Sequence, residues 1–385
     1  MTRAEVSPDI ALPRRSVAAS KPRLGYRPAL DGIRGIAIVA VMLTHAGLVT
    51  NLAGFIGVDV FFVLSGFLIT ALLVGEWDEF NRISLTQFYW RRALRLLPAL
   101  LLMLACIAAF EWLTDTRRSA LLTSGGALLA LSYVSNWTDT LGYYQGQIFG
   151  HTWTLSIEEQ FYLLWPLVII LLLRRASSRQ STIRFIFLAA FLAMVCRLAL
   201  LYIGETEYRI SRGTDTRADA LLMGSVVGMM FASGLLPNRA WVKKLLGVLG
   251  LLVFVVVALI FLGFYQRFPG QFKINFIYGA VSFVTAILIL HLVGSEAGRL
   301  NWILSRPWLV YVGKISYGLY LWHYPIFRLT QLKEFPRATE LAIEMSLTLL
   351  MTLVSFHLLE RPLLRYKNAF CYPTAGAPPC LQVAG

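Results

Sequence analysis

The stretch FIGVDVFFVLSGFLITALLV, residues 55–74, contains only one charged residue, Asp59. As a helix rising about 1.5 Å per residue, it would cover about 30 Å, the thickness of the hydrocarbon core of a bilayer. The composition of the whole chain agrees, because 57% of its 385 residues are hydrophobic and only 15% are charged. The sequence therefore predicts a membrane protein rather than a soluble one.

Other apolar runs are also long enough to cross a bilayer. They cover residues 33–49, 96–112, 157–173, 185–203, 221–236, 245–264, 274–293, 309–329 and 341–358. The apolar segment 121–131 is shorter, and we interpret it as a re-entrant or interfacial piece of a long outer loop. The predicted fold is an all-α polytopic membrane protein with about ten transmembrane helices.

The formal net charge is +14, but the basic residues gather in short clusters between apolar runs. This distribution is typical of membrane topology and argues against nucleic-acid binding. If segment 121–131 does not cross, the clusters share one side, which predicts that both termini are cytoplasmic. We expect a disordered cytoplasmic arm over 1–28, a transmembrane domain over 29–367 and a short cytoplasmic tail over 368–385, in the inner or plasma membrane.

Two ionisable residues, Arg34 and His45, lie in the first predicted helix, eleven residues apart. They differ by only about 20° around the helix axis and lie about 16 Å apart along it. An ionisable group in hydrocarbon costs a few kcal/mol, so the shared face indicates a function such as proton transfer by His45. The other interpretation is an arginine that extends to the interface and a histidine satisfied in the core.

Three further ionisable residues fall near the level of His45 when depth is counted along their helices. These are Asp59, Glu158 and His323, all in the outer half of the membrane. A carboxylate from Asp59 or Glu158 there would orient a catalytic imidazole. Asp59 would equally well pair with an arginine and hold two helices together.

Two arginines, Arg92 and Arg95, stand at the start of the third predicted helix in FYWRRALRLLP, residues 88–98. Three residues apart, they project from one side of the helix and suit the phosphates of coenzyme A. Arginines that only set the topology are the other interpretation. No cysteine has metal-ligand spacing, and we expect no metal.

Polar residues also mark the outer ends of two predicted helices. HTWTLSIEEQFYLLWP, residues 151–166, contains His151 and Trp153, which are candidates to bind an acceptor. Interfacial aromatics are common in membrane proteins, so Trp153 has a simpler interpretation too. Asp215 and Arg217 open another helix, and with Asp219 they would either bind an acceptor or satisfy one another.

These motifs together resemble the membrane acyltransferase-3 family, which O-acylates bacterial glycans and some macrolides. The resemblance rests on RPALDGIRGIA (27–37), His45, GVDVFFVLSGFLIT (57–70), and the motifs at 92–98, 151–166, 215–224, 313–325 and 360–362. They occur in the family's order and cover roughly residues 27–365. A single motif would be weak, but their joint occurrence is specific.

The resemblance implies an integral membrane O-acyltransferase with acetyl-CoA as the usual donor. His45 matches the family's essential histidine, Arg34 the arginine before it, and Arg92 and Arg95 its cytoplasmic Arg-x-x-Arg pair. The acceptor would be a hydroxyl of a glycan, a lipid-linked sugar or a macrolide.

The predicted site therefore has three parts. The catalytic residues are His45, Asp59 and Glu158; the donor-binding residues are Arg34, Arg92 and Arg95; the acceptor side has His151, Trp153, Asp215, Arg217 and His323. His45 would either take the acyl group itself or remove the acceptor's proton. The alternative function is a transporter or exporter of a polar metabolite, which would use the same buried charges as a binding site.

Overall fold

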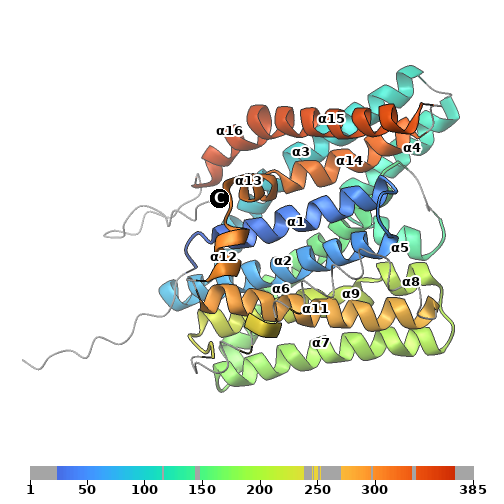
Figure 1. Cartoon of the computed structure of the whole chain (residues 1–385). Helices are drawn as coiled ribbons and strands as arrows, with labels where there is room; N and C mark the ends of the chain where they lie inside the picture. The colour runs from blue at the N-terminus through green and yellow to red at the C-terminus, as the bar shows by residue number, and fades with distance from the viewer. Residues whose placement is uncertain are drawn as a thin grey trace, which may run out of the picture.

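A computed structural model describes residues 24–114, 117–143, 148–237, 270–295, 298–331 and 335–368, with a few single positions between 245 and 252. Over these ranges the protein is a bundle of helices and contains no strand (Figure 1). The predicted all-α fold is confirmed.

The long helices lie side by side along one direction (Figure 1). They are α1 (Pro28–His45), α2 (Asn51–Phe80), α3 (Leu85–Thr114), α6 (Trp153–Arg175), α7 (Arg179–Tyr202), α9 (Thr214–Ala232), α11 (Gly270–Gly294) and α15 (Arg337–Ser355). The shorter helices are α4 (Arg117–Leu131), α5 (Ser135–Thr140), α8 (Glu207–Arg212), α12 (Arg299–Leu304), α13 (Pro307–Lys314), α14 (Ser316–Thr330) and α16 (Arg361–Leu363). Single turns at η1 (Gly150–Thr152), η3 (Phe356–Glu360) and η4 (Leu364–Asn368) complete the described chain.

Six of the described helices are long and apolar enough to cross a membrane, so the chain is a multi-pass membrane protein. They are Pro28–His45, Ala53–Phe80, Leu85–Thr114, Gly150–Arg175, Arg179–Tyr202 and Arg337–Tyr366. Each contains or overlaps one of the predicted transmembrane runs. The short run 121–131 forms most of α4, which packs against α3 and falls below the length of these spans.

The other predicted spans have different outcomes. Run 221–236 lies mostly in α9, run 274–293 lies in α11, and run 245–264 lies outside the continuous described ranges. The single helix predicted over 309–329 is wrong, because the chain forms α13 and then α14, with a break at Ile315. α13 packs chiefly against α1, whereas α14 packs chiefly against α15 and to a lesser extent against α1.

The bundle has two distinct ends (Figure 1). The start of α1, the helices α12 and α13, and α16 lie at one end, whereas α4, α5 and α8 lie at the other. The first end also holds the start of α3, because Trp90 of α3 donates to the Tyr366 carbonyl of η4 at 3.3 Å and Arg95 of α3 interacts electrostatically with Arg34 of α1. It is called the arginine end below. That this end faces the cytoplasm stays a prediction from the distribution of basic residues.

The centre of the bundle contains an unusually close contact between α2 and α9. A Cβ atom at Gly66 would overlap the backbone carbonyl of Leu221, and one at Gly224 would overlap that of Val63. Small residues allow helix backbones to approach in this way inside membranes, where apolar side chains give no hydrophobic driving force. The contact sets α9 directly against α2.

Candidate active site

Two histidines from opposite parts of the chain meet near the end of the bundle that lies away from the arginines. His45 is the last residue of α1, and His323 lies in the middle of α14. Nδ1 of His45 lies 3.0 Å from Nε2 of His323, and the ring centroids are 5.0 Å apart. The equal depth predicted for the two side chains is therefore realised as a direct hydrogen bond.

A third histidine and two tyrosines complete this group. His151 stacks on Tyr324 with ring centroids 5.0 Å apart, and its ring centroid lies 5.7 Å from that of His323. His151 is only 2% exposed, yet neither of its ring nitrogens has a hydrogen-bond partner within the described chain. His45, His151, His323, Tyr320 and Tyr324 are called the histidine cluster below.

Hydrogen bonds from Tyr320 join α14 to the start of α6. Its hydroxyl donates to the backbone carbonyl of His151 at 2.9 Å and lies 2.6 Å from Oγ1 of Thr154. Neither tyrosine was among the residues predicted for the site. The sequence spacing could have indicated Tyr320, because it precedes His323 by three residues and so lies on the same face of the helix.

The face of α1 that carries Arg34 and His45 points into the protein. Ile38 and Val41, which lie between them on that face, are 0% and 1% exposed. The His45 ring meets His323 and Tyr324. The face shared by Arg34 and His45 therefore lies against other helices rather than against lipid, and its functional role stays a prediction.

Arg34, Arg92 and Arg95 gather near the arginine end of the bundle. Arg95 interacts electrostatically with both of the others, and Arg95 is exposed. The guanidinium carbon of Arg92 lies 3.6 Å from the centroid of the Tyr162 ring. None of the three forms an ion pair with a described carboxylate. This arginine cluster therefore carries positive charge that no described ion pair neutralises.

Glu158 lies closer to the arginine cluster than the sequence predicted. Its Oε1 accepts a hydrogen bond of 2.6 Å from the hydroxyl of Ser65. Among the charged neighbours of Glu158, Arg92 has the strongest electrostatic interaction with it. No described hydrogen bond joins it to His45. Glu158 is placed more than one turn inside α6, which directs the carboxylate to the middle of α2 rather than to the end of α1.

Asp59 also lies away from His45. It forms a buried ion pair with Arg217 of α9, whose guanidinium carbon lies 4.0 Å from the centroid of the Tyr278 ring. Of the two interpretations of Asp59, the structure favours the one in which an arginine pair holds two helices together. The predicted contact between Asp59 and an imidazole is therefore wrong, because the partner of Asp59 is Arg217.

The polar residues at the start of α9 do not satisfy one another. Arg217 pairs with Asp59, Asp219 pairs with Arg197 at 2.8 Å, and Asp215 pairs with Arg209 at 2.6 Å. Positions two apart on a helix point in nearly opposite directions, so each side chain meets a different neighbour. Arg217 and Asp219 are consequently buried in the bundle, whereas Asp215 lies near its surface.

Trp153 is buried in an aromatic layer beside the histidine cluster. Its ring centroid lies 6.5 Å from that of Phe55 and 6.4 Å from that of Phe62. The guanidinium carbon of Arg212 lies 5.7 Å from the Trp153 ring. This indole is 6% exposed and packs between helices, which distinguishes it from an aromatic residue at the membrane surface.

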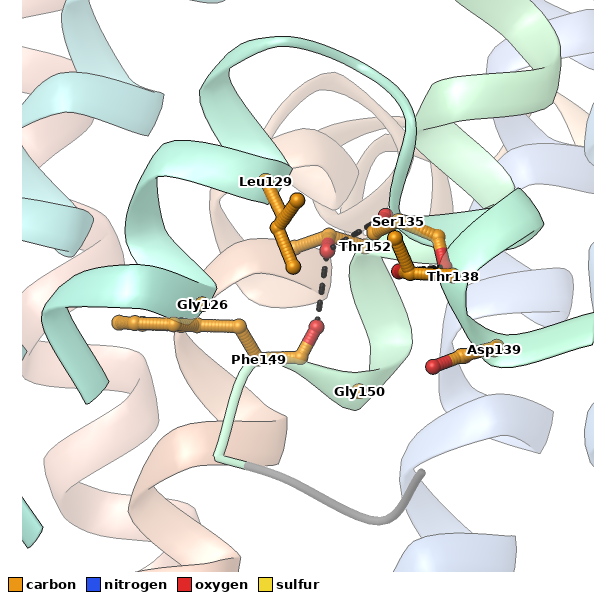
Figure 2. A pocket seen from close by; sticks show the side chains of 8 residues that line it. All are labelled: Gly126, Leu129, Ser135, Thr138, Asp139, Phe149, Gly150 and Thr152. Carbon is orange, nitrogen blue, oxygen red and sulfur yellow. Dashed lines mark hydrogen bonds between the residues drawn. The ribbon is translucent and has the colours of Figure 1, made fainter. Parts of the chain in front are cut away.

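A small pocket lies between α4, α5 and η1 at the same end of the bundle (Figure 2). It is lined by Gly126, Leu129, Ser135, Thr138, Asp139, Phe149, Gly150 and Thr152. His151 lies between the last two lining residues in sequence, and a Cβ at Gly150 would lie 3.0 Å from the Tyr324 hydroxyl. The Thr152 hydroxyl donates to the Phe149 carbonyl at 2.8 Å, and its oxygen lies 3.1 Å from the Ser135 hydroxyl (Figure 2).

The pocket combines hydroxyl groups with one carboxylate. Its cavity volume is about 10 Å³, which is space for about one water molecule. The pocket therefore admits at most a single small group, such as one hydroxyl.

Comparisons with known proteins show the family of the chain. The family model described as "Acyltransferase domain" matches residues 27–360. The O-acetyltransferase OatA of Staphylococcus aureus strain NCTC 8325 is 33% identical over 356 residues, which cover 88% of this chain and 57% of OatA. A protein of strain MSSA476, whose name assigns the same activity provisionally, is 32% identical over 355 residues and is covered to 58% of its length. The chain thus spans little more than half the length of these relatives, and no solved structure matches it.

Proposed function

From the premise that the chain belongs to the acyltransferase family matched over residues 27–360, we propose that it is a membrane O-acyltransferase. It would move an acyl group from acyl-CoA in the cytoplasm to a hydroxyl of a carbohydrate-type acceptor. Acetyl is the preferred acyl group, because the names of the relatives specify O-acetyl transfer. The observation that carries the proposal is the inward-facing α1 surface that joins Arg34 to His45.

The donor would bind at the arginine cluster. Arg34, Arg92 and Arg95 supply three guanidinium groups without a described ion-pair partner, and guanidinium forks match phosphate oxygens in geometry and charge. The phosphates of coenzyme A would dock there, and its pantetheine arm would extend along the buried face of α1 toward His45.

His45 would act as the general base for transfer. It takes the proton of the acceptor hydroxyl while the hydroxyl oxygen attacks the thioester carbonyl carbon. A carbon–oxygen bond forms, the carbon–sulfur bond breaks, and coenzyme A leaves as a thiolate that takes up a proton. Burial of the neighbouring histidine and aromatic rings excludes water, which would otherwise compete with the acceptor.

The acceptor would approach from the end of the bundle away from the arginines. Ser135, Thr138 and Thr152 offer hydroxyl groups in the small pocket, and Asp139 offers a carboxylate. Such groups suit the hydroxyls of a sugar, which both donate and accept hydrogen bonds. The imidazole of His151, with no described hydrogen-bond partner, lies between this pocket and His323.

Release of free coenzyme A from acetyl-CoA by the purified protein tests this proposal. We expect His45→Ala to lower the rate by at least about 100-fold, which is the usual contribution of a general base. The matched control is His357→Ala, because His357 is exposed and lies near the opposite end of the bundle.

Two outcomes would contradict the proposal. A wild-type protein that releases no thiol, with or without oligosaccharide acceptors, would favour the transporter interpretation. A His45→Ala variant with the activity of the wild type would remove His45 from the chemistry.

A further inference from the structure

The hydrogen bonds of His323 determine which of its two ring nitrogens carries a proton. Nδ1 of His323 lies 3.0 Å from the backbone carbonyl oxygen of Leu319. A carbonyl oxygen only accepts, so this nitrogen must donate and therefore carries the hydrogen. His323 is 0% exposed, and burial disfavours a charged imidazolium. A neutral imidazole has one N–H, so Nε2 of His323 is an acceptor.

The tautomer of His45 follows from that of His323. Its Nδ1 lies 3.0 Å from Nε2 of His323, which has only a lone pair to offer. Nδ1 of His45 must donate in this hydrogen bond. In neutral His45 the lone pair is then on Nε2, on the other side of the ring.

We propose that His323 is a positioning residue that holds His45 as the tautomer with Nδ1 protonated and Nε2 free to act as the base. The effect of His323 on catalysis rests on the proposed function. The tautomer that His323 imposes on His45 does not depend on that function. When Nε2 of His45 takes the acceptor proton, Nδ1–H continues to donate to His323. The proton ends on His45, and His323 stays neutral throughout.

No carboxylate of the described chain is placed to orient His45 instead. Asp59 is held by Arg217, and Glu158 accepts from Ser65. Within the described residues, the only side chain hydrogen-bonded to the His45 ring is His323.

A second contact limits rotation of the His45 ring. The ring of Tyr324 packs against it edge to face, with centroids 5.0 Å apart and an interplanar angle of 85°. Tyr324 follows His323 directly in α14, so one helix both orients the imidazole and sets its tautomer. A backbone carbonyl thereby takes the place that a carboxylate has at the far end of a Ser-His-Asp triad.

Nitrogen-15 NMR of histidine-labelled protein in detergent micelles tests the tautomer directly. The chain has five histidines, and single His→Gln variants assign their signals. We expect His45 and His323 each to carry the hydrogen on Nδ1. A His45 signal with the hydrogen on Nε2 would overturn the proposal, whatever the activity of the protein.

A pair of substitutions at His323 tests the consequence. His323→Gln keeps an oxygen that can accept from Nδ1 of His45, whereas His323→Met has a similar size and no comparable acceptor. We expect the Met variant to lower kcat for coenzyme A release by about 10- to 100-fold, and the Gln variant to keep most of it. The KM for acetyl-CoA should be the same in both variants, because His323 does not touch the donor site.

The two proposals fail in different ways. Equal kcat values for the Gln and Met variants would overturn the positioning role, even with His45 essential. If His45→Ala is fully active while the NMR tautomer is as stated, the placement by His323 stands and the catalytic proposal for His45 fails. Should the Met variant not fold, the NMR measurement on the wild type still decides the tautomer.

Discussion

Arg217 of α9 forms an ion pair with Asp59 of α2 in the interior of the bundle, where their side chains are 0% and 1% exposed. Arg197 and Asp219 form a second buried pair nearby, at 2.8 Å. Charges at such depth are tolerated only because each has a partner. These pairs join α2, α7 and α9 where the sequence alone offered several possible partners.

Removing Asp59 should destabilise the protein strongly. Asp59→Ala leaves the Arg217 charge buried without its partner, which costs about 3–5 kcal/mol. The double variant Asp59→Leu with Arg217→Met should recover much of that loss, because no unpaired charge remains. Thermal unfolding in detergent measures both. A single variant as stable as the wild type would show that the pair does not hold the helices.

Gly66 should tolerate no larger residue. Its missing Cβ is what lets α2 contact the backbone of α9 at Leu221, and Gly66→Ala should cost roughly 1–3 kcal/mol through overpacking. Gly75 lies on the same helix with no heavy atom near its Cβ position, so Gly75→Ala should be neutral or slightly stabilising. Equal melting temperatures for the two variants would contradict the close contact.

Arg95 should contribute to binding of the phosphates of the donor. We expect Arg95→Ala to raise the KM for acetyl-CoA by about 10-fold or more, the loss of one charge-assisted hydrogen bond. The KM for S-acetylpantetheine, which lacks the nucleotide phosphates, should not change. Arg91→Ala is the matched control, because Arg91 donates to Gln87 at 2.8 Å and lies outside the arginine cluster. Equal effects on both donors would argue against phosphate recognition.

Stability should depend on the protonation of Asp139, which lies on α5 outside the spanning helices. Burial raises the pKa of Asp139 from 3.8 to about 6, although the neighbouring Arg212 favours the charged form. The folded protein therefore binds this proton more tightly than the unfolded chain. The contribution of Asp139 to the free energy of unfolding is full below about pH 4 and is lost as the pH rises through about 6.

Comparison with Asp139→Asn isolates this effect from other titrating groups. The stability of the wild type relative to the Asn variant should fall between pH 4 and pH 6 and then level off, as followed by thermal unfolding. If the stability of the wild type relative to the Asn variant rises with pH over this range, the attraction of the Asp139 carboxylate to Arg212 outweighs the cost of burying its charge.

The sequence allowed parts of the site to be predicted because they are local. Arg34 and His45 share a face through helix geometry alone, and the depth of His323 follows from counting residues along its helix. The partner of Asp59 was not predictable, because Arg217 follows it by 158 residues and several arginines were available.

What the sequence determined by itself is that this chain is a helical membrane protein and which ionisable residues it buries, because hydropathy and helix periodicity act over a few turns. Only the tertiary structure decided that His323 rather than a carboxylate meets His45, that Glu158 bonds to Ser65, and that run 309–329 is divided into α13 and α14. These outcomes depend on which helices pack together, and helix packing is set by contacts between residues far apart in the chain.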